Sequence, residues 1–81
     1  MKIRIIGRLF DKPVDILAEI ASRESALANV RWLDARSATP MSVSDEGDTL
    51  VVRVPPDGEK ALAAYIDEQA RQERQLQVRD N

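Results

Sequence analysis

Apolar and polar residues alternate over the first nine positions of the chain. Ile3, Ile5 and Leu9 share one side of an extended segment, and Arg4 lies on the other. A period of two is typical of a strand that is buried on one face. The pattern therefore predicts a first strand over residues 2–9.

The apolar spacing then changes to that of a helix. The residues that recur at intervals of three and four are Pro13, Ile16, Leu17, Ile20 and Leu27. Such spacing places them on one side of a helix. Asp11 can cap its start, Pro13 is tolerated in a first turn whose N–H groups lack helical partners, and Asn29 suits its end. A helix is predicted from residue 11 to about residue 29.

The segment from Asn29 to Ala35 alternates again. Val30 and Trp32 lie on one of its faces, and Leu33 lies on the other. This pattern predicts a second strand. Trp32 is the only tryptophan of the chain, and we expect it to anchor the core.

A hairpin and a second helix complete the pattern. The turn residues Asp45 to Asp48 predict a hairpin in which Val43 faces Leu50. The apolar residues of the helix that follows Pro55 and Pro56 are Leu62, Tyr65, Ile66 and Ala70. Residues 76–81 are predicted either to add a short last strand or to fray, as chain ends often do.

The predicted order is β-α-β-β-α with an optional final β, in a single domain over residues 1–81. Helices with one apolar side and strands with one apolar face call for two layers. The predicted fold class is α+β, a ferredoxin-like two-layer sandwich with an antiparallel sheet and both helices on one face. The first strand and the strand within residues 49–54 are the most continuously aliphatic, which places them at the centre of the sheet.

Composition restricts the chemistry that the chain can perform. It contains neither cysteine nor histidine, which removes disulfides, thiolate metal sites and the commonest general base. The acidic cluster of Asp45, Glu46 and Asp48 lacks the ligand spacing of a calcium loop. We expect no catalytic residues, no metal site and no cofactor, and therefore a protein that is not an enzyme.

Charge and hydropathy bear on location and partners. The apolar start is interrupted by Arg4, Gly7 and Arg8, well short of a signal-peptide core or a membrane span. We expect a cytoplasmic protein without membrane insertion. The net charge of −2 and an aromatic content of 4% disfavour nucleic-acid binding, because RNA-binding sheets need a positive field and aromatic side chains for base stacking.

The polar face of the predicted sheet mixes basic and aliphatic residues. Such a surface is more often an oligomer interface than a platform for nucleic acid. The interface candidates are Arg4, Ile6, Arg31, Leu33, Val51 and Arg53. We expect a homodimer, or a partner protein that binds this face or the second helix.

Four segments of the chain together resemble a known family. They read "IIGRLFDKPVDILAEIAS", "NVRWLDA", "GDTLVVRV" and "GEKALAAYIDEQ", and their spacing is similar to that of the NIL domain, an ACT-like regulatory module with a ferredoxin-like fold. The resemblance implies a dimer that binds a small amino acid, methionine in the NIL domains of importer ATPases, near its interface. Val14 stands where ACT domains carry a glycine. The ligand-binding residues that the resemblance implies are Gly7, Arg8, Leu9, Phe10, Asp11, Lys12, Asn29, Val30 and Trp32.

Two functions follow as alternatives. In the first, N–H groups at the start of the predicted first helix receive the carboxylate of an amino acid, and Asp11 receives its ammonium group. Asp11 can equally do no more than cap that helix. In the second, the chain is a small protein-binding adaptor or inhibitor, like those encoded by mobile elements, which uses the sheet face or the second helix.

Overall fold

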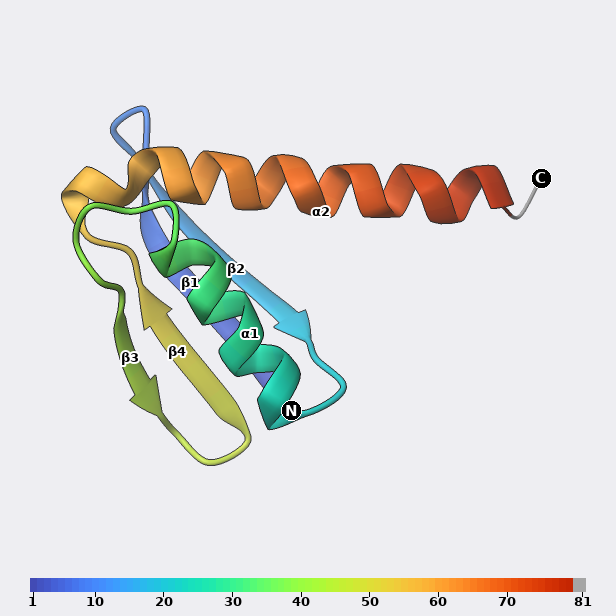
Figure 1. Ribbon diagram of the computed structural model, residues 1–81, viewed down its shortest axis with the longest axis horizontal. Coiled ribbons are helices and arrows are strands. Elements are labelled where there is room, and N and C mark those ends of the chain that lie inside the picture. The colour runs from blue at the N-terminus through green and yellow to red at the C-terminus, as the bar shows by residue number, and fades with distance from the viewer. Residues whose placement is uncertain (80–81) are drawn as a thin grey trace.

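Two β-hairpins and two α-helices alternate along the chain (Figure 1). The computed structural model describes the backbone of residues 1–79 and the side chains of residues 1–72. The elements are β1 (Lys2–Leu9), β2 (Lys12–Glu19), α1 (Arg23–Asp34), β3 (Ser42–Asp45), β4 (Thr49–Arg53), the 3₁₀ turn η1 (Pro56–Gly58) and α2 (Glu59–Arg79).

The four strands form one sheet in the order β2-β1-β4-β3. β1 pairs antiparallel with β2, from Lys2 opposite Glu19 to Leu9 opposite Lys12. β1 also pairs parallel with β4, and β4 pairs antiparallel with β3. The two most aliphatic strands, β1 and β4, therefore lie at the centre of the sheet, as the sequence predicts.

The α+β fold class is confirmed, since one four-stranded sheet is combined with two helices. The order of elements is β-β-α-β-β-α, which is the predicted β-α-β-β-α with β2 added between β1 and α1. The added strand reverses the chain once more, so the second hairpin enters the sheet in the opposite direction. As a result β4 runs parallel to β1, and the sheet is mixed where an antiparallel one was predicted.

Residues 12–19 form strand β2, and the prediction of a helix there is wrong. The segment fits both periods, because Ile16, Leu17 and Ile20 have helical spacing while Val14, Ile16 and Ile20 share one side of a strand. Short apolar segments are ambiguous in this way. Pairing with β1 along the whole of β2 gives every second residue of β2 backbone hydrogen bonds to β1, and it decides for the strand.

The first helix begins at Arg23 and covers the segment predicted as a second strand. Ser22 has an extended backbone, and its hydroxyl accepts a hydrogen bond of 3.2 Å from the Ser25 N–H, as an N-cap does. The buried residues of α1 are Ala26, Val30 and Leu33. Their spacing of four and three residues places them on one side of a helix. Residues 29–35 also alternate, but the sheet offers no strand with which they pair.

The second hairpin is confirmed, but its register is shifted by two residues from the prediction. Val43 pairs with Val52, and Asp45 pairs with Leu50. The chain reverses through Gly47, whose φ of 81° lies in the left-handed region that glycine adopts without strain. This tighter turn brings Asp45, predicted as a loop residue, into the ladder.

Helix α2 is longer than predicted and extends to Arg79. Residues 76–79, considered for a short last strand, are helical, and residues 80–81 lie outside the described residues. The end of α2 consists largely of Gln, Arg and Glu, which favour helices. The last turns of α2 run past the edge of the sheet (Figure 1).

The core lies between the sheet and both helices. Its buried residues are Ile3, Ile5, Leu50 and Val52 from the central strands, Ala26, Val30 and Leu33 from α1, Met41 from the α1–β3 connection, and Ala61, Leu62 and Tyr65 from α2. The strand residues in this set alternate along β1 and β4, so both helices cover the same face of the sheet. We call the opposite face, which carries Arg4 and Leu17, the outer face.

Trp32 and Tyr65 join the two helices. Their ring centroids lie 6.0 Å apart with the rings at 71°, an edge-to-face contact that aromatic pairs prefer. The guanidinium carbon of Arg36 lies over the Trp32 ring, 3.7 Å from its centroid. Trp32 thus packs against the core as predicted, although it does so from a helix.

Candidate functional site

The segment predicted to bind an amino acid lies in and beside the β1–β2 turn. Gly7, Arg8 and Leu9 end β1, Phe10 and Asp11 form the turn, and Lys12 begins β2. The second part of that predicted site, Asn29, Val30 and Trp32, lies in the middle of α1. The sequence-predicted ligand site is therefore divided between a hairpin end and a helix interior.

No helix begins at Asp11, which removes the physical basis proposed for holding a carboxylate there. The free N–H groups of the first turn belong to α1, and they follow Ser22. The sequence signal for the true start was present, because Ser22 is followed by Glu24, an acidic residue that suits a first helical turn. Binding of a small amino acid stays a prediction without a preformed carboxylate site at the turn.

The β1–β2 turn has an unusual backbone. Phe10 and Asp11 have φ angles of 53° and 63°, the left-handed conformation that two-residue hairpin turns of this type require and that Asn and Gly prefer. Two side chains support it. Glu59 Oε1 accepts a hydrogen bond of 2.6 Å from the Phe10 N–H, and Arg8 donates one of 2.8 Å to the Asp11 carbonyl.

A hollow of about 430 Å³ lies between this turn and the start of α2. It is lined by Leu9, Phe10, Glu59, Lys60 and Ala63, so none of its lining comes from residues 29–32. Gly7 does not line the hollow, and a Cβ added to it would meet side-chain atoms of Leu62 and Val54 at 3.0 Å. Gly7 thus serves the packing of α2 on the sheet.

Four of the six predicted interface residues lie on the outer face. Arg4 and Ile6 of β1 and Val51 and Arg53 of β4 alternate with the core positions of the same strands. Leu33 does not belong there, because it is fully buried in the core. Arg31 lies on α1 and is exposed. Both misassignments follow from reading α1 as a strand.

The outer face also contains a shallow hollow and an ion pair. The hollow measures about 630 Å³ and is lined by Lys2, Arg4, Asp15, Leu17, Glu46, Asp48, Thr49 and Val51. Arg4 holds both carboxylate oxygens of Asp15, with nitrogen to oxygen distances of 2.9 and 2.5 Å. Their strand positions are diagonal, since Arg4 is paired with Leu17 and Ile6 with Asp15.

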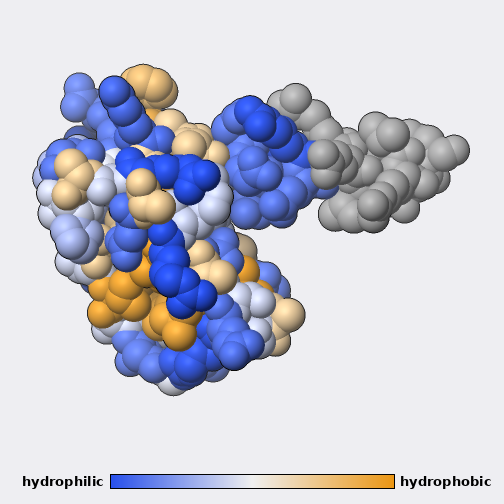
Figure 2. All heavy atoms as spheres, in the orientation of Figure 1, coloured by the Kyte–Doolittle hydropathy of each residue, from blue (hydrophilic) through white to orange (hydrophobic). Residues whose placement is uncertain are grey.

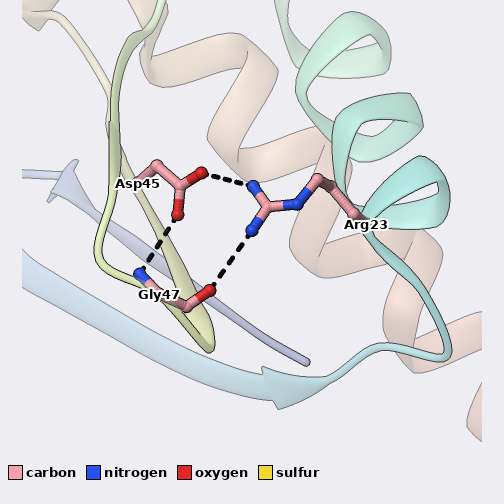
Figure 3. A network of polar contacts seen from close by, with 3 residues as sticks. All are labelled: Arg23, Asp45 and Gly47. Carbon is pink, nitrogen blue, oxygen red and sulfur yellow. Dashed lines mark hydrogen bonds and ion pairs between the residues drawn. The ribbon is translucent and has the colours of Figure 1, made fainter.

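A second ion pair ties α1 to the turn of the second hairpin (Figure 3). Arg23 binds the Asp45 carboxylate, and its other terminal nitrogen donates a hydrogen bond of 3.3 Å to the Gly47 carbonyl. The second carboxylate oxygen of Asp45 accepts one of 3.1 Å from the Gly47 N–H. The carboxylate is thus used within the fold. Among the described residues no cluster of three or more acidic side chains could hold a metal ion.

The two ion pairs make a pH dependence testable. Hydrogen bonds from Arg4 and from Arg23 lower the pKa of Asp15 and of Asp45, respectively, and the Gly47 N–H adds to the lowering at Asp45. Because each pKa is lower in the folded chain than in the unfolded one, these contacts stabilise the fold above about pH 4 and are lost as pH falls through the folded pKa values.

An NMR titration of the carboxyl groups checks this prediction. Arg4→Gln is expected to raise the pKa of Asp15 toward its ordinary value and to leave Asp45 unchanged. Arg23→Gln is expected to raise the pKa of Asp45 toward its ordinary value and to leave that of Asp15 unchanged. If one substitution moved both values, or neither, the pairing described here would be wrong.

Four large apolar side chains in the described part of the chain are exposed. They are Phe10 at the first turn, 80% exposed; Leu17 on the outer face, 60%; Leu27 on α1, 39%; and Val43 on β3, 43%. Hydrophobic atoms gather at the surface over β4, between α1 and β3, on the helix side of the molecule (Figure 2). The sequence reading missed Leu17 because it placed this residue on the buried side of a helix.

The comparisons with known proteins leave the family open. No helix in residues 1–79 is both long enough and apolar enough to cross a membrane. No protein-family model matches the chain, and neither the curated proteins nor the solved structures contain a match. The similarity to the NIL domain therefore stays a prediction, and function has to be inferred from the surfaces described above.

Proposed function

We propose that this protein is a non-catalytic module that binds an extended segment of another protein as a fifth strand beside β2. The observation that carries this proposal is the position of Leu17. Its side chain is 60% exposed in the middle of a strand that forms one edge of the sheet. Exposed edges of this kind are where peptides add to sheets.

The hydrogen bonds of the first hairpin define which backbone groups of β2 face outward. Ile20 donates to the Met1 carbonyl at 2.8 Å, and in an antiparallel pair hydrogen-bonded and non-hydrogen-bonded positions alternate. Asp15, Leu17 and Glu19 are therefore in non-hydrogen-bonded pairs, with their N–H and C=O groups directed away from β1. Three consecutive sites for strand addition result.

Pro13 fits the same alternation of hydrogen-bonded and non-hydrogen-bonded pairs. It lies opposite Arg8, in a non-hydrogen-bonded pair, so its missing N–H costs no bond to β1. It also leaves no donor at that point of the edge, and the free edge therefore begins at Asp15. The other edge strand, β3, has only four residues, and its Asp45 is bound by Arg23.

Charge indicates which segment fits. Asp15 and Glu19 flank Leu17 on the outer face. Arg4 already holds Asp15, so the favourable cross-strand pair for an added strand is a basic residue opposite Glu19, next to an apolar residue opposite Leu17. A second copy of β2 fits poorly. Antiparallel pairing centred on Leu17 would place Asp15 opposite Glu19 of the other copy, and like charges in that position are destabilising.

Nucleic-acid binding has less support on this face. Arg4, one of its cations, is already paired with Asp15. The three aromatic residues of the chain lie elsewhere, with Trp32 and Tyr65 between the helices and Phe10 in a turn. A protein segment needs neither free cations nor stacking platforms.

Titration with two short peptides tests the proposal. One peptide alternates valine with lysine, and the other alternates valine with glutamate. The lysine peptide is expected to bind more tightly and to slow amide hydrogen exchange at Asp15, Leu17 and Glu19. Its affinity should decrease with salt, because exposed charge pairs are screened.

Two variants separate the backbone from the side chain. Leu17→Pro removes one outward N–H and should weaken lysine-peptide binding by at least about tenfold, and Leu17→Ala, which keeps that donor, should weaken it less. Equal binding of both peptides, or unchanged exchange at saturation, would contradict strand addition. A rise in melting temperature with one of the twenty amino acids would instead support the ligand-binding alternative.

A further inference from the structure

The turn residue Phe10 is unfavourable for the isolated chain in two ways. Its side chain is 80% exposed, and its φ of 53° is a conformation that bulky residues rarely adopt. Asn or Gly at this position would relieve the backbone and remove the exposed ring. Residues held in strained backbone conformations cluster at active sites, ligand clamps and switch regions, which makes Phe10 a candidate for a functional contact.

The turn is also held in a defined position. The Phe10 N–H donates to the Glu59 carboxylate at 2.6 Å, and Arg8 holds the Asp11 carbonyl at 2.8 Å. These two bonds join the hairpin to the start of α2 and to β1. The ring is therefore presented on an ordered backbone, which lowers the entropy cost of using it as an anchor.

An apolar hollow lies directly beside the ring. The hollow is open to solvent, measures about 430 Å³, and is lined by Leu9 and Phe10 of the hairpin and by Glu59, Lys60 and Ala63 of α2. One patch thus carries both an exposed aromatic side chain and an apolar hollow. Its rim carries one carboxylate, on Glu59, and one ammonium group, on Lys60.

We propose that this patch binds a second copy of the chain about a two-fold axis, with Phe10 of each copy in the hollow of the other. A two-fold interface brings the same patch from both subunits together, so that residue i contacts residue j and j contacts i. The ring of one copy then packs on Leu9 and Ala63 of the other. Glu59 of each copy lies near Lys60 of its partner, and both charge pairs are favourable.

This surface is distinct from the β2 edge, so the dimer proposal can be tested independently of the peptide-binding proposal. The patch is small, and small interfaces give weak, concentration-dependent association. A dissociation constant on the order of 10 to 100 µM is expected. Sedimentation equilibrium of the full chain over a concentration series measures it.

Phe10→Asn is the first test. It is expected to weaken dimerisation at least about tenfold, since aromatic anchors dominate such interfaces. In dilute solution, where the chain is monomeric, it is expected to raise the melting temperature by about 2 to 5 °C, because the strained turn is relieved. Val43→Ser, which removes a side chain 43% exposed on β3, is the matched control and should leave the dimer unchanged.

A charge reversal at Lys60 tests the two-fold geometry. Lys60→Glu places like charges opposite Glu59 of the partner at both symmetry-related contacts and should weaken the dimer. Lys60→Arg keeps the positive charge and should leave the dimer intact. Glu59 is kept unchanged in this test, because its carboxylate also accepts the hydrogen bond from the Phe10 N–H.

Three results would overturn the proposal. They are a chain that stays monomeric up to about 1 mM, far above the expected dissociation constant; a dimer unaffected by Phe10→Asn; and a dimer that Lys60→Glu leaves unchanged. Persistence of the dimer in Leu17→Pro is expected, and it separates this interface from the β2 edge.

Discussion

Replacing Leu33 by alanine is expected to lower the free energy of unfolding by about 3 kcal/mol. Leu33 is fully buried between α1 and the sheet, and truncating a buried leucine removes its transfer free energy and leaves a cavity. For a chain of this length the melting temperature should fall by roughly 12 to 20 °C. Urea unfolding followed by circular dichroism gives the value directly.

Leu27→Ala is the matched control for Leu33→Ala. Leu27 lies on the same helix but is 39% exposed, so its truncation should cost less than about 1 kcal/mol. The comparison also separates two assignments of Leu33. A variant that is as stable as the parent but fails to associate would return Leu33 to the interface that the sequence predicted.

A pair of proline substitutions in β2 is expected to give very different results. Ile16→Pro removes an N–H from a hydrogen-bonded pair with Ile5 and a side chain from the core side of β2, and it should cost at least about 3 kcal/mol. Leu17→Pro removes an N–H that faces solvent, and it should cost less than about 1 kcal/mol. Denaturant midpoints of the two variants give the difference.

This comparison tests the main correction to the sequence reading. If residues 12–19 were helical, both prolines would lie in a helix interior and each would cost about 3 kcal/mol. Equal destabilisation by the two variants would therefore contradict strand β2. If Ile16→Pro destabilised the fold much more than Leu17→Pro, the result would also support an outward-facing Leu17 N–H, on which the peptide-binding proposal depends.

Much of the fold could be read from local patterns. β1 was predicted with the bounds that the structure has, and the strand around Val52 and the helix containing Leu62 were predicted as such. In these segments only one period fits the apolar residues. The central position of β1 and β4 followed from their continuous aliphatic character, because central strands are the most deeply buried.

The region between β1 and β3 could not be read in the same way. Residues 12–20 fit a helical and a strand period at once. Because they were predicted as a helix, the segment that forms α1 was in turn predicted as a strand. The Ser22 cap and the alternation from Val14 to Ile20 were the signals for the correct assignment. Without knowledge of the pairing with β1, these two signals do not outweigh the helical spacing of the same apolar residues.

The outer face could be read from the sequence, but the two proposed binding surfaces, the β2 edge and the Phe10 patch, could not. Arg4, Ile6, Val51 and Arg53 were placed correctly on one face, because alternation in β1 and β4 is unambiguous. The exposure of Leu17 and the strained backbone of Phe10 were not predicted. Both depend on the first hairpin, whose two-residue turn lacks the Asn-Gly signature that usually reveals such turns.

The sequence by itself determined the α+β class, the absence of cysteine and histidine chemistry, and the strands and helix in which one hydrophobic period dominates. Only the tertiary structure decided that residues 12–19 pair with β1 and that α1 begins after Ser22. The physical reason is that local propensities for the two states differ little there, whereas pairing along a whole strand satisfies many backbone groups at once. The β2 edge and the Phe10 patch exist because of that pairing.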